Sequence, residues 1–272
     1  MLGKPVSHSL SPVIHNAGYA AAGLTGWSYT AIECAEVELA DLVAGLGPEW
    51  AGLSITMPLK EVALTVADEA APLAATLGAA NTLVHRPDGS WFADNTDAPG
   101  MEAALREAVE EVIVERVVLL GAGGTARAAL AAAARLGASR ITVVARRVAA
   151  VDELRPVAAA LGVEVTHAPW PAVPTPSGVE VLSGADLIIS TVPKGVADPL
   201  ADAIRWRSGA LLLDALYDPW PTPLAAAARA GGVRVVSGLD LLLAQAVGQF
   251  EAFTGVSAPV DAMRAALVAA RA

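Results

Sequence analysis

Two charged side chains in the first third of the chain have the types and the setting for acid–base chemistry. Lys60 ends the run Thr-Met-Pro-Leu-Lys after a strand-like segment, and Asp97 ends the run Asp-Asn-Thr-Asp. An ammonium group can give a proton to a developing alkoxide and stabilise its charge meanwhile, and a neighbouring carboxylate can orient that ammonium. Such a pair suits the reduction of a ketone by hydride. Structural roles stay open, because Lys60 could lie in the first turn of a helix and Asp97 could cap the next one.

Hydroxyl and amide side chains accompany this pair. Ser9 and Ser11 stand on one loop just before a predicted helix, Thr56 follows the strand-like segment, and Asn81 begins another. In an open α/β sheet, the loops beyond the carboxyl ends of the strands line the ligand cleft. The set therefore predicts a polar substrate site. Ser11 as a helix cap and Asn81 as a turn residue are the alternatives.

A glycine-rich turn opens the middle of the chain. The stretch from Val117 to Arg147 reads as strand, tight turn, alanine-rich helix and second strand, and its turn contains Gly121, Gly123 and Gly124. Glycines at such a turn let backbone N–H groups approach a pyrophosphate at a helix N-terminus, so this order predicts a dinucleotide-binding βαβ unit. The pattern G-x-G-x-x-A is weak by itself, and a purely structural turn is the alternative.

The end of the second strand of this unit distinguishes the two nicotinamide cofactors. A carboxylate there binds the ribose 2′-OH of NAD, whereas a basic residue meets the 2′-phosphate of NADP. Here Arg146 and Arg147 follow Ala145, and no carboxylate occurs before Asp152. Two guanidinium groups suit a phosphate through charge-assisted hydrogen bonds, so the sequence favours NADP. A solvated arginine pair at the end of a strand is the alternative.

The elements that must position these residues alternate between strand and helix. Strand-like runs are residues 27–33, 51–56, 81–86, 90–94, 117–120, 141–145, 163–168, 185–191, 210–217 and 233–238. Helical patterns mark residues 11–23, 36–46, 58–68, 101–111, 151–162, 222–232, 239–253 and 260–271. This alternation predicts an α/β fold, with an N-terminal α/β substrate domain and a Rossmann-type domain built on a doubly wound parallel sheet.

Composition disfavours several other classes of protein. The formal net charge of −10 argues against a nucleic-acid partner, because phosphate binding rewards clustered Lys and Arg. No apolar run reaches the ~20 residues of a membrane-spanning helix, and the N-terminus lacks the apolar core of a signal peptide, so we expect no membrane partner and a soluble, cytoplasmic protein. The single cysteine, Cys34, excludes an internal disulfide, and scattered histidines predict no metal site.

Taken together, the motifs resemble the shikimate dehydrogenase family. They are H-S-x-S-P-x-x-H-N, T-x-P-x-K, G-A-x-N-T-L, D-N-T-D, G-A-G-G-x-A-R, Y-D-P-x-x-T-P-L and a late A-Q-A, in this order along the chain. The resemblance implies reversible, NADPH-dependent reduction of 3-dehydroshikimate to shikimate on the way to aromatic amino acids. It also implies a substrate-binding catalytic domain of residues 1–98, joined by the C-terminal helices 239–272, and an NADP-binding domain of residues 99–238. The active site would lie in the cleft between them.

The resemblance also implies roles for individual residues of this sequence. Those that resemble the catalytic pair are Lys60 and Asp97. Those that resemble the groups holding the substrate carboxylate are Ser9, Ser11 and Tyr217, and those that resemble the groups binding the ring hydroxyls are Thr56, Asn81, Asp97 and Gln245. Around the cofactor, the pyrophosphate would meet Gly121, Ala122, Gly123, Gly124 and Thr125, the 2′-phosphate would meet Arg146 and Arg147, and the nicotinamide would lie near Ala215 and Gly238.

The chain departs from the family pattern at a few positions. Arg147 stands where the family usually has threonine, and Asp240 replaces a glycine common before the late helix. Only Met1 and Leu2 precede Gly3, so the first strand looks truncated and the real start of the protein is expected upstream. None of these changes removes a residue of the predicted catalytic pair.

Three functions stay open. They are the biosynthetic enzyme, a quinate/shikimate dehydrogenase that uses NAD in quinate degradation, and a non-catalytic NADP-binding regulator with the same fold. Ser11 favours shikimate as the substrate, because quinate users of the family tend to carry threonine at that position. Retention of both Lys60 and Asp97 argues against the regulator. The oligomeric state stays open between a monomer and a homodimer.

Overall fold

The computed structural model describes residues 1–108, 114–171, 174 and 179–271. The chain divides into two compact units. The first unit contains Met1–Gly100 and Leu242–Ala272, and the second contains Met101–Leu241. The first unit is therefore discontinuous in sequence, whereas the second is one continuous stretch. The division of function between residues 1–98 and 99–238 stays a prediction.

A parallel sheet forms the centre of the second unit. In the described part of the chain its strands are β7 (Val117–Leu120), β8 (Arg140–Ala145), β9 (Glu164–Pro169), β10 (Leu187–Ser190), β11 (Leu211–Asp214) and β12 (Arg234–Ser237). They lie in the order β12-β11-β10-β7-β8-β9, and every neighbouring pair is parallel. Every residue of β7, β10 and β11 is buried, as expected for strands covered on both faces. The predicted Rossmann-type sheet is confirmed, with its switch point between β7 and β10.

Helices connect these strands. Those described are α6 (Gly124–Arg135), α7 (Val148–Asp152), α8 (Arg155–Ala160), α9 (Glu180–Ser183) and α10 (Pro223–Ala230), with the 3-10 turn η2 (Asp198–Leu200). The prediction of one helix over residues 151–162 is wrong, because α7 ends at Asp152 and α8 begins anew around Pro156. Proline lacks an N–H group, so it is suited to the first turn of a helix and not to its interior. Residues 109–111 of the predicted helix 101–111, and most of the Pro-rich loop predicted after residue 168, lie outside the described residues.

The first unit contains a small mixed sheet. Its strands are β3 (Gly52–Ser54), β4 (Glu69–Ala70), β5 (Thr82–His85) and β6 (Trp91–Asp94), in the order β3-β5-β6-β4, and a separate parallel pair is formed by β1 (Leu2–Gly3) and β2 (Ile32–Glu33). β5 is antiparallel to β3 and β6, while β4 is parallel to β6. β5 and β6 are the predicted hairpin, and its turn contains Gly89 at φ 85°. The strand predicted over residues 27–33 is shorter, because Asn16 binds both the N–H and the C=O of Tyr29 in place of a strand partner.

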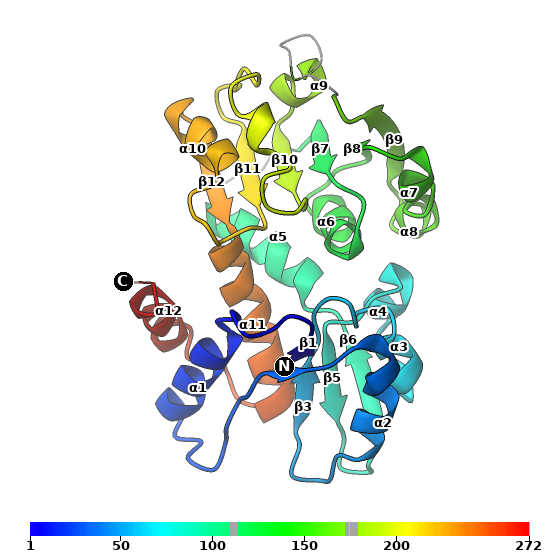
Figure 1. Cartoon of the computed structure of the whole chain (residues 1–272), viewed down its shortest axis with the longest axis vertical. Helices are drawn as coiled ribbons and strands as arrows, with labels where there is room; N and C mark the ends of the chain where they lie inside the picture. The colour runs from blue at the N-terminus through cyan, green and yellow to red at the C-terminus, as the bar shows by residue number, and fades with distance from the viewer. Residues whose placement is uncertain (109–113, 172–173, 175–178, 272) are drawn as a thin grey trace. The chain divides into compact units, whose positions relative to one another are not determined.

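Helices from both ends of the chain pack together in the first unit (Figure 1). They are α1 (Ser11–Ala21), η1 (Glu36–Glu38), α2 (Leu39–Ala44), α3 (Ala63–Val66), α4 (Pro72–Leu77), α5 (Asp97–Ala108), α11 (Gly238–Thr254) and α12 (Val260–Ala269), of which α5 and α11 also reach into the second unit. Phe250 of α11 is fully buried against Tyr19 and Gly18 of α1. This contact joins the last helices of the chain to the first one.

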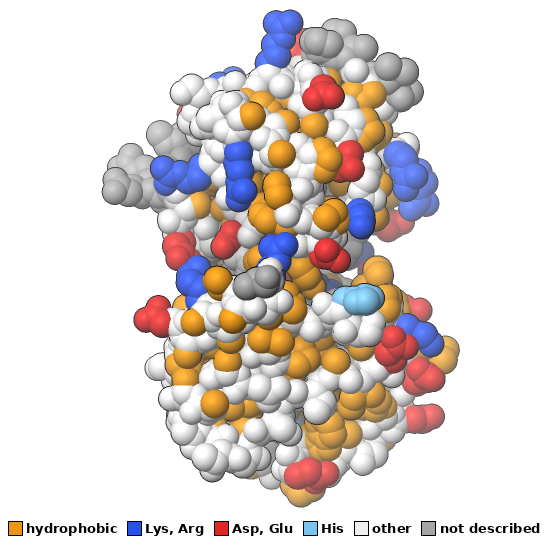
Figure 2. Space-filling model, turned by 60° about the vertical axis from the view of Figure 1, so that its left-hand side comes forward, with side chains coloured by type: hydrophobic (Ala, Val, Ile, Leu, Met, Phe, Trp, Pro, Cys, Tyr) orange, Lys and Arg blue, Asp and Glu red, His pale blue; other side chains and the backbone are white. Residues whose placement is uncertain are grey.

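The surface of the molecule is mixed in charge. On the face drawn in Figure 2, acidic and basic side chains are interspersed among apolar and neutral ones. Among the residues that the structure describes, no helix combines the length and the apolar character needed to cross a membrane.

Candidate active site

The strand order of the first unit explains why distant polar residues meet. β5 is antiparallel to both neighbours, so the end of β3, the start of β5 and the end of β6 lie side by side. The edge of the sheet formed by these three strand ends carries the candidate site. Ser54 pairs with Thr82, and Thr82 pairs with Asp94. Asn81 directly precedes β5, and Asp97 follows β6 by three residues. The predicted polar residues between 56 and 97 are therefore gathered at one edge.

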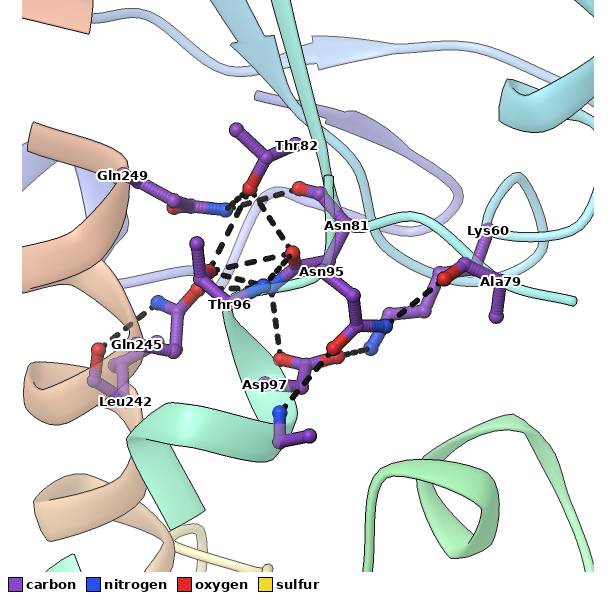
Figure 3. Close-up of polar contacts among 11 residues, drawn as sticks. Lys60, Ala79, Asn81, Thr82, Asn95, Thr96, Asp97, Leu242, Gln245 and Gln249 are labelled. Atoms are coloured by element: carbon purple, nitrogen blue, oxygen red, sulfur yellow. Dashed lines mark hydrogen bonds and ion pairs between the residues drawn. The ribbon is translucent and has the colours of Figure 1, made fainter. Parts of the chain in front are cut away.

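Lys60 and Asp97 form an ion pair at this edge, with 2.5 Å between Nζ and Oδ2 (Figure 3). Their side chains keep 18% and 13% of their surface exposed, so the pair is largely withdrawn from water and yet reachable. The other carboxylate oxygen, Oδ1, accepts a hydrogen bond from Nδ2 of Asn81 at 2.9 Å. Both oxygens of Asp97 thus have a partner, Lys60 at Oδ2 and Asn81 at Oδ1. These two contacts fix the orientation of the carboxylate relative to the Lys60 ammonium group.

The helix predicted to open at Pro58 is wrong. Residues 57–62 form turns, and α3 begins only at Ala63. The reason is a long-range contact: the carbonyl of Lys60 accepts a hydrogen bond from the N–H of Ala80 at 2.7 Å, beside Asn81. This bond fastens the backbone of Lys60 to the segment that leads into β5. The alternative of a surface lysine in the first turn of a helix is therefore excluded.

The alternative role of Asp97 as a helix cap is also wrong. Asp97 is the first residue of α5, and the N–H of Ala98 is bound at 3.2 Å by Oδ1 of Asn95. Asn95 is itself buried and donates to the carbonyl of Ala79 at 2.9 Å. Because Asn95 binds the first turn of α5, the carboxylate of Asp97 is left for Lys60 and Asn81.

Asn81 is the hub of the hydrogen-bond network and is only 1% exposed. The two hydrogens of its Nδ2 are shared among three acceptors: Asp97 Oδ1 at 2.9 Å, Thr96 Oγ1 at 3.0 Å and Gln245 Oε1 at 3.3 Å. Its Oδ1 accepts from the N–H of Thr96 at 2.8 Å and from the hydroxyl of Thr82 at 2.9 Å. A buried amide satisfied on every side has one orientation, so Asn81 is much more than a turn residue.

Gln245 reaches this network from α11. Its Nε2 donates to the carbonyl of Leu242 at 2.9 Å, which leaves Oε1 facing Asn81. The helix comes this close because Gly100 of α5 has no side chain: a Cβ there would lie 2.7 Å from the backbone nitrogen of Gln245. The network thus depends on close contact between α5 and α11.

Three residues of this network escaped the sequence analysis: Thr82, Thr96 and Gln249. Thr96 stood inside the quoted run Asp-Asn-Thr-Asp without being singled out. Gln249 follows Gln245 by one helical turn in Gln-Ala-Val-Gly-Gln, and this spacing, which places both side chains on one face of a helix, was the available signal.

The alternative role of Ser11, as the cap of the first helix, is wrong. Ser11 is not the cap of α1 but its first residue, the cap position is occupied by Leu10, and no side chain caps the helix. Ser9 Oγ instead accepts a hydrogen bond from the N–H of Ser11 at 3.2 Å. Within the described residues no hydrogen bond joins either serine to the network around Asn81. Thr56, which follows β3, packs against Gly3, where a Cβ would lie 2.3 Å from its Cγ2.

Tyr217 lies in the second unit, on the loop after β11, whereas Ser9 and Ser11 belong to the first unit. Burial, and then the negative charge of Asp218, raises the pKa of its phenol. The phenol is therefore a neutral hydrogen-bonding group at ordinary pH.

The glycine turn of the second unit has the shape that a pyrophosphate requires. Gly121 adopts φ 98°, and a Cβ there would meet Thr191 Oγ1 and Val192 Cγ1 at 3.0 Å. In contrast, added Cβ atoms at Gly123 and Gly124, which begin α6, would meet open space: among the described residues, nothing beyond their chain neighbours and the helix backbone lies within 4 Å. No side chain caps this helix of 12 residues, and Ala122 and Thr125 beside the glycines are half-buried. The turn therefore fits an anionic ligand.

Arg146 and Arg147 follow β8 and are both exposed. Arg147 takes the cap position of α7 in an extended conformation, with φ −118° and ψ 124°. Neither guanidinium has an ion pair or a hydrogen bond to any residue that the structure describes. Both are therefore available to a phosphate, and the chain's cofactor-side residues fit NADP.

Ala215 and Gly238 lie against one another in the second unit. A Cβ on Gly238 would be 2.2 Å from the carbonyl oxygen of Ala215, and the N–H of Gly238 donates to Leu216 at 3.1 Å. Asp240, the departure next to them, has a structural explanation. Its Oδ2 accepts from the N–H and the hydroxyl of Ser237 at 2.8 and 2.7 Å, while its N–H faces the same hydroxyl at 3.3 Å. This reciprocal arrangement caps the start of α11.

A cavity of about 650 Å³ in the first unit lies away from these polar residues. Its lining includes the aromatic residues Trp27, Tyr29, Trp50, His85 and Phe253. None of the residues predicted to bind the substrate lines it. In the described ranges, moreover, no group of His, Cys, Asp and Glu side chains is arranged to hold a metal ion. Hydrogen bonding, and not cavity size, therefore identifies the candidate site.

Comparison with known proteins identifies the family. Sequence profiles match for the shikimate dehydrogenase substrate binding domain over residues 1–83 and for the shikimate 5′-dehydrogenase C-terminal domain over residues 238–268. The shikimate dehydrogenase (NADP(+)) of Caulobacter vibrioides is 42% identical over 259 residues, which cover 93% of this chain and 88% of that protein. The chain belongs to the shikimate dehydrogenase family.

Solved structures agree with this assignment. The crystal structure of Mycobacterium tuberculosis shikimate dehydrogenase is similar with a TM-score of 0.86 and 45% identity, covering 98% of this chain and 97% of that one. A quinate dehydrogenase from Corynebacterium glutamicum, in complex with NAD, is also similar, with a TM-score of 0.85 but only 26% identity over 98% and 97% of the two chains. Proteins of similar structure thus include one that is named for quinate and was solved with NAD.

Proposed function

We propose that the protein is an NADP-dependent shikimate dehydrogenase, which reversibly reduces 3-dehydroshikimate to shikimate in the biosynthesis of aromatic amino acids. The observation that carries the proposal is the Lys60–Asp97 ion pair fixed by Asn81. Similarity to shikimate dehydrogenases (NADP(+)) over nearly the whole chain supports the same function.

NADPH supplies the hydride when it is bound. Lys60 gives a proton from its ammonium group to the ketone oxygen as negative charge develops there, and so becomes a neutral amine. In the oxidative direction the amine takes the proton back from the hydroxyl. Asp97 holds the ammonium in place throughout, and the limited exposure of the pair strengthens its electrostatic effect on the reacting oxygen.

The remaining polar groups of the first unit bind the substrate. Ser9 and Ser11 hold the carboxylate through their hydroxyls, with Tyr217 as a further neutral donor. The ring hydroxyls are bound by Thr56, Asn81, Asp97 and Gln245. The support is that Asn81, Asp97 and Gln245 already share one network, whose donors and acceptors a polyol can join.

The second unit holds the nucleotide. The open N-terminus of α6, from Gly121 to Thr125, takes the pyrophosphate, and the unpaired Arg146 and Arg147 take the 2′-phosphate. Ala215 and Gly238 provide a backbone surface for the nicotinamide, since no side chain other than a methyl group projects from either residue.

Two rival functions are less well supported. NAD has no 2′-phosphate, so an NAD-using quinate dehydrogenase would not need Arg146 and Arg147, which are exposed after β8 and have no partner among the described residues. The similar quinate dehydrogenase also shares only 26% identity with this chain. A non-catalytic NADP-binding regulator would not need an ion pair of 2.5 Å between a lysine and a carboxylate held by a third residue. One experiment distinguishes both alternative functions from the proposed one.

The test is the absorbance band of NADPH, followed when shikimate or quinate is mixed with NADP or NAD and the purified protein. We expect the fastest rise with shikimate and NADP. A faster rise with quinate and NAD would replace the proposal by the degradative enzyme. Absence of signal in all four mixtures would leave the regulator.

We also propose that the enzyme acts in the cytoplasm as a monomer or a homodimer and has no nucleic-acid partner. The net charge of −10 supports the last point. Sedimentation of the purified protein distinguishes the two assembly states.

A further inference from the structure

Gln249 is a buried polar side chain to which neither the motifs nor the mechanism assigns a role. It lies on α11, is 1% exposed, and uses its whole amide group. Nε2 donates to the carbonyl of Asn81 at 2.9 Å and lies 3.2 Å from the hydroxyl of Thr82, while Oε1 accepts from the hydroxyl of Ser54 at 2.8 Å. One side chain thus ties α11 to both β3 and β5.

The bond to Asn81 is the important one. Among the described residues, the carbonyl of Asn81 accepts two hydrogen bonds, from the N–H of Ile55 at 2.7 Å and from Gln249. The first bond fixes this residue to the neighbouring strand, and the second fixes it to the helix. Figure 3 shows the bond from Gln249 and the side chain of Asn81 reaching Asp97. With the bond from Ile55, the backbone of Asn81 is held from two directions.

α11 approaches this edge closely because a small residue precedes Gln249. At Gly248 a Cβ would lie 3.2 Å from Cγ2 of Thr96, tighter than ordinary contact. Thr96 in turn is bound to the side chain of Asn81. Gly248 and Gln249 together set the distance between α11 and the segment that carries Asp97.

We propose that Gln249 is a positioning residue for the reaction, which acts through Asn81 on the orientation of Asp97 and so of Lys60. This inference rests on the proposed function. It extends that function by a residue that touches neither the Lys60 ammonium nor the Asp97 carboxylate. A chain of hydrogen bonds connects it to both: Gln249 to Asn81, Asn81 to Asp97, and Asp97 to Lys60.

The experiment compares four full-length proteins: wild type, Gln249→Leu, Asn81→Ala and the double variant. Leucine fills a similar volume but makes no hydrogen bond. Displacement of a reacting group by less than an ångström is costly, so kcat with shikimate and NADP should fall between about tenfold and a hundredfold in Gln249→Leu. The Michaelis constant for NADP should not change. In the double variant kcat should equal that of Asn81→Ala. Alanine at position 81 has no amide group that could bind Asp97, so Gln249 has no such group to position.

Phe250→Leu is the matched control, since Phe250 is a buried neighbour on the same helix that packs toward α1. It should lower the melting temperature without lowering kcat. If Gln249→Leu does not fold, Gln249→Met, with an unbranched side chain of similar path, replaces it. Normal kcat in the Gln249 variant, full multiplication of both losses in the double variant, or an equal loss in Phe250→Leu overturns the inference. An inactive wild type defeats the proposed function itself, and this inference with it.

Discussion

At the scale of single residues, the proposed chemistry depends on how firmly Lys60 is held. Lys60 is bound at both ends: its carbonyl by Ala80 and its ammonium by Asp97. A flexible side chain loses rotamer freedom when it is fixed in this way, and here that loss is incurred on folding and not during the reaction. The arrangement is what a general acid requires.

Lys60→Ala should therefore lower turnover by ~10²- to 10⁴-fold, the usual contribution of a positioned acid, while shikimate still binds. Initial rates give kcat, and calorimetric titration gives the dissociation constant for shikimate. Lys4→Ala removes an exposed lysine of the same unit and should leave both values unchanged. Near-normal turnover of Lys60→Ala would remove this lysine from the mechanism.

Arg146→Ala tests the choice of cofactor. The loss of a charge-assisted hydrogen bond worth about 1.5–3 kcal/mol should raise the Michaelis constant for NADP by roughly tenfold to a hundredfold and leave that for NAD nearly unchanged. Steady-state kinetics with both nucleotides measures the difference. Arg140→Ala is the control, because Arg140 lies at the opposite end of β8 and pairs with Glu164. Equal effects of Arg146→Ala on both nucleotides would contradict the assignment.

At the scale of elements, the site depends on the contact of two helices. Gly100 of α5 lies so close to Gln245 of α11 that the nearest atoms to an added Cβ are backbone atoms, at 2.7 and 2.8 Å. A side chain could relieve such a contact by changing its rotamer, whereas backbone atoms move only if the helix moves. Any larger residue at position 100 must therefore push the helices apart and withdraw Gln245 from Asn81.

We expect Gly100→Ala to destabilise the protein by about 1–3 kcal/mol, the usual cost of overpacking, and to raise the Michaelis constant for shikimate. Urea denaturation and initial rates check the two effects. Gly45→Ala is the control: Gly45 ends α2 at φ −88°, and an added Cβ would meet its nearest neighbour at 3.5 Å, an ordinary contact. If the two variants behave alike, close contact at Gly100 is not needed.

Elements differ in how well the sequence predicts them. The sequence predicted the positions of the second unit's strands along the chain. β7, β10 and β11 are buried on both faces, and each therefore appears in the sequence as a mostly apolar run. The helix expected from Pro58 failed because Ala80, a residue distant in sequence, binds the carbonyl of Lys60. The strand expected around Tyr29 failed because the side chain of Asn16 replaces its partner strand. Local patterns do not contain such contacts.

The same limit applies to the candidate site. Lys60, Asn81 and Asp97 stood out because they are polar residues next to strand-like runs, and the structure brings all three together. Gln249 did not, because its partners lie on strands some 170 residues earlier in the chain. Its spacing from Gln245 indicates that both side chains share a helix face, but does not indicate what that face contacts.

At the scale of the whole molecule, one buried histidine links stability to pH. His15 of α1 is fully buried, its ring stacks on Tyr29 at 4.2 Å, and neither ring nitrogen has a hydrogen-bond partner among the described residues. Burial, and then the positive N-terminus, lowers the pKa of His15 from 6.5 to about 3. Between pH 6.5 and about pH 3, His15 is protonated in the unfolded chain and neutral in the folded chain. The free energy of unfolding therefore decreases as the pH falls through this range.

His15→Phe should remove this pH dependence while keeping the stack on Tyr29. Each pH unit within the window costs about 1.4 kcal/mol, so the loss of unfolding free energy between pH 7 and pH 5 should be about 2 kcal/mol smaller in the variant. Urea denaturation at both pH values measures it. His8→Phe replaces an exposed histidine and should behave as wild type. An unchanged pH dependence in His15→Phe would mean that other groups cause the acid sensitivity.

The discontinuity of the first unit has a consequence for how the protein is made. Residues 101–241 are synthesised before residues 242–272, so the ribosome completes the second unit while the first unit still lacks Gln245, Gln249 and Phe250. Domains usually fold as units in the order of their synthesis. Here the unit whose chain starts first must finish last, and until then the buried polar groups of Ser54, Asn81 and Thr82 lack their partners on α11. A nascent chain can thus complete its second unit before Asn81 has its hydrogen-bond partners on α11.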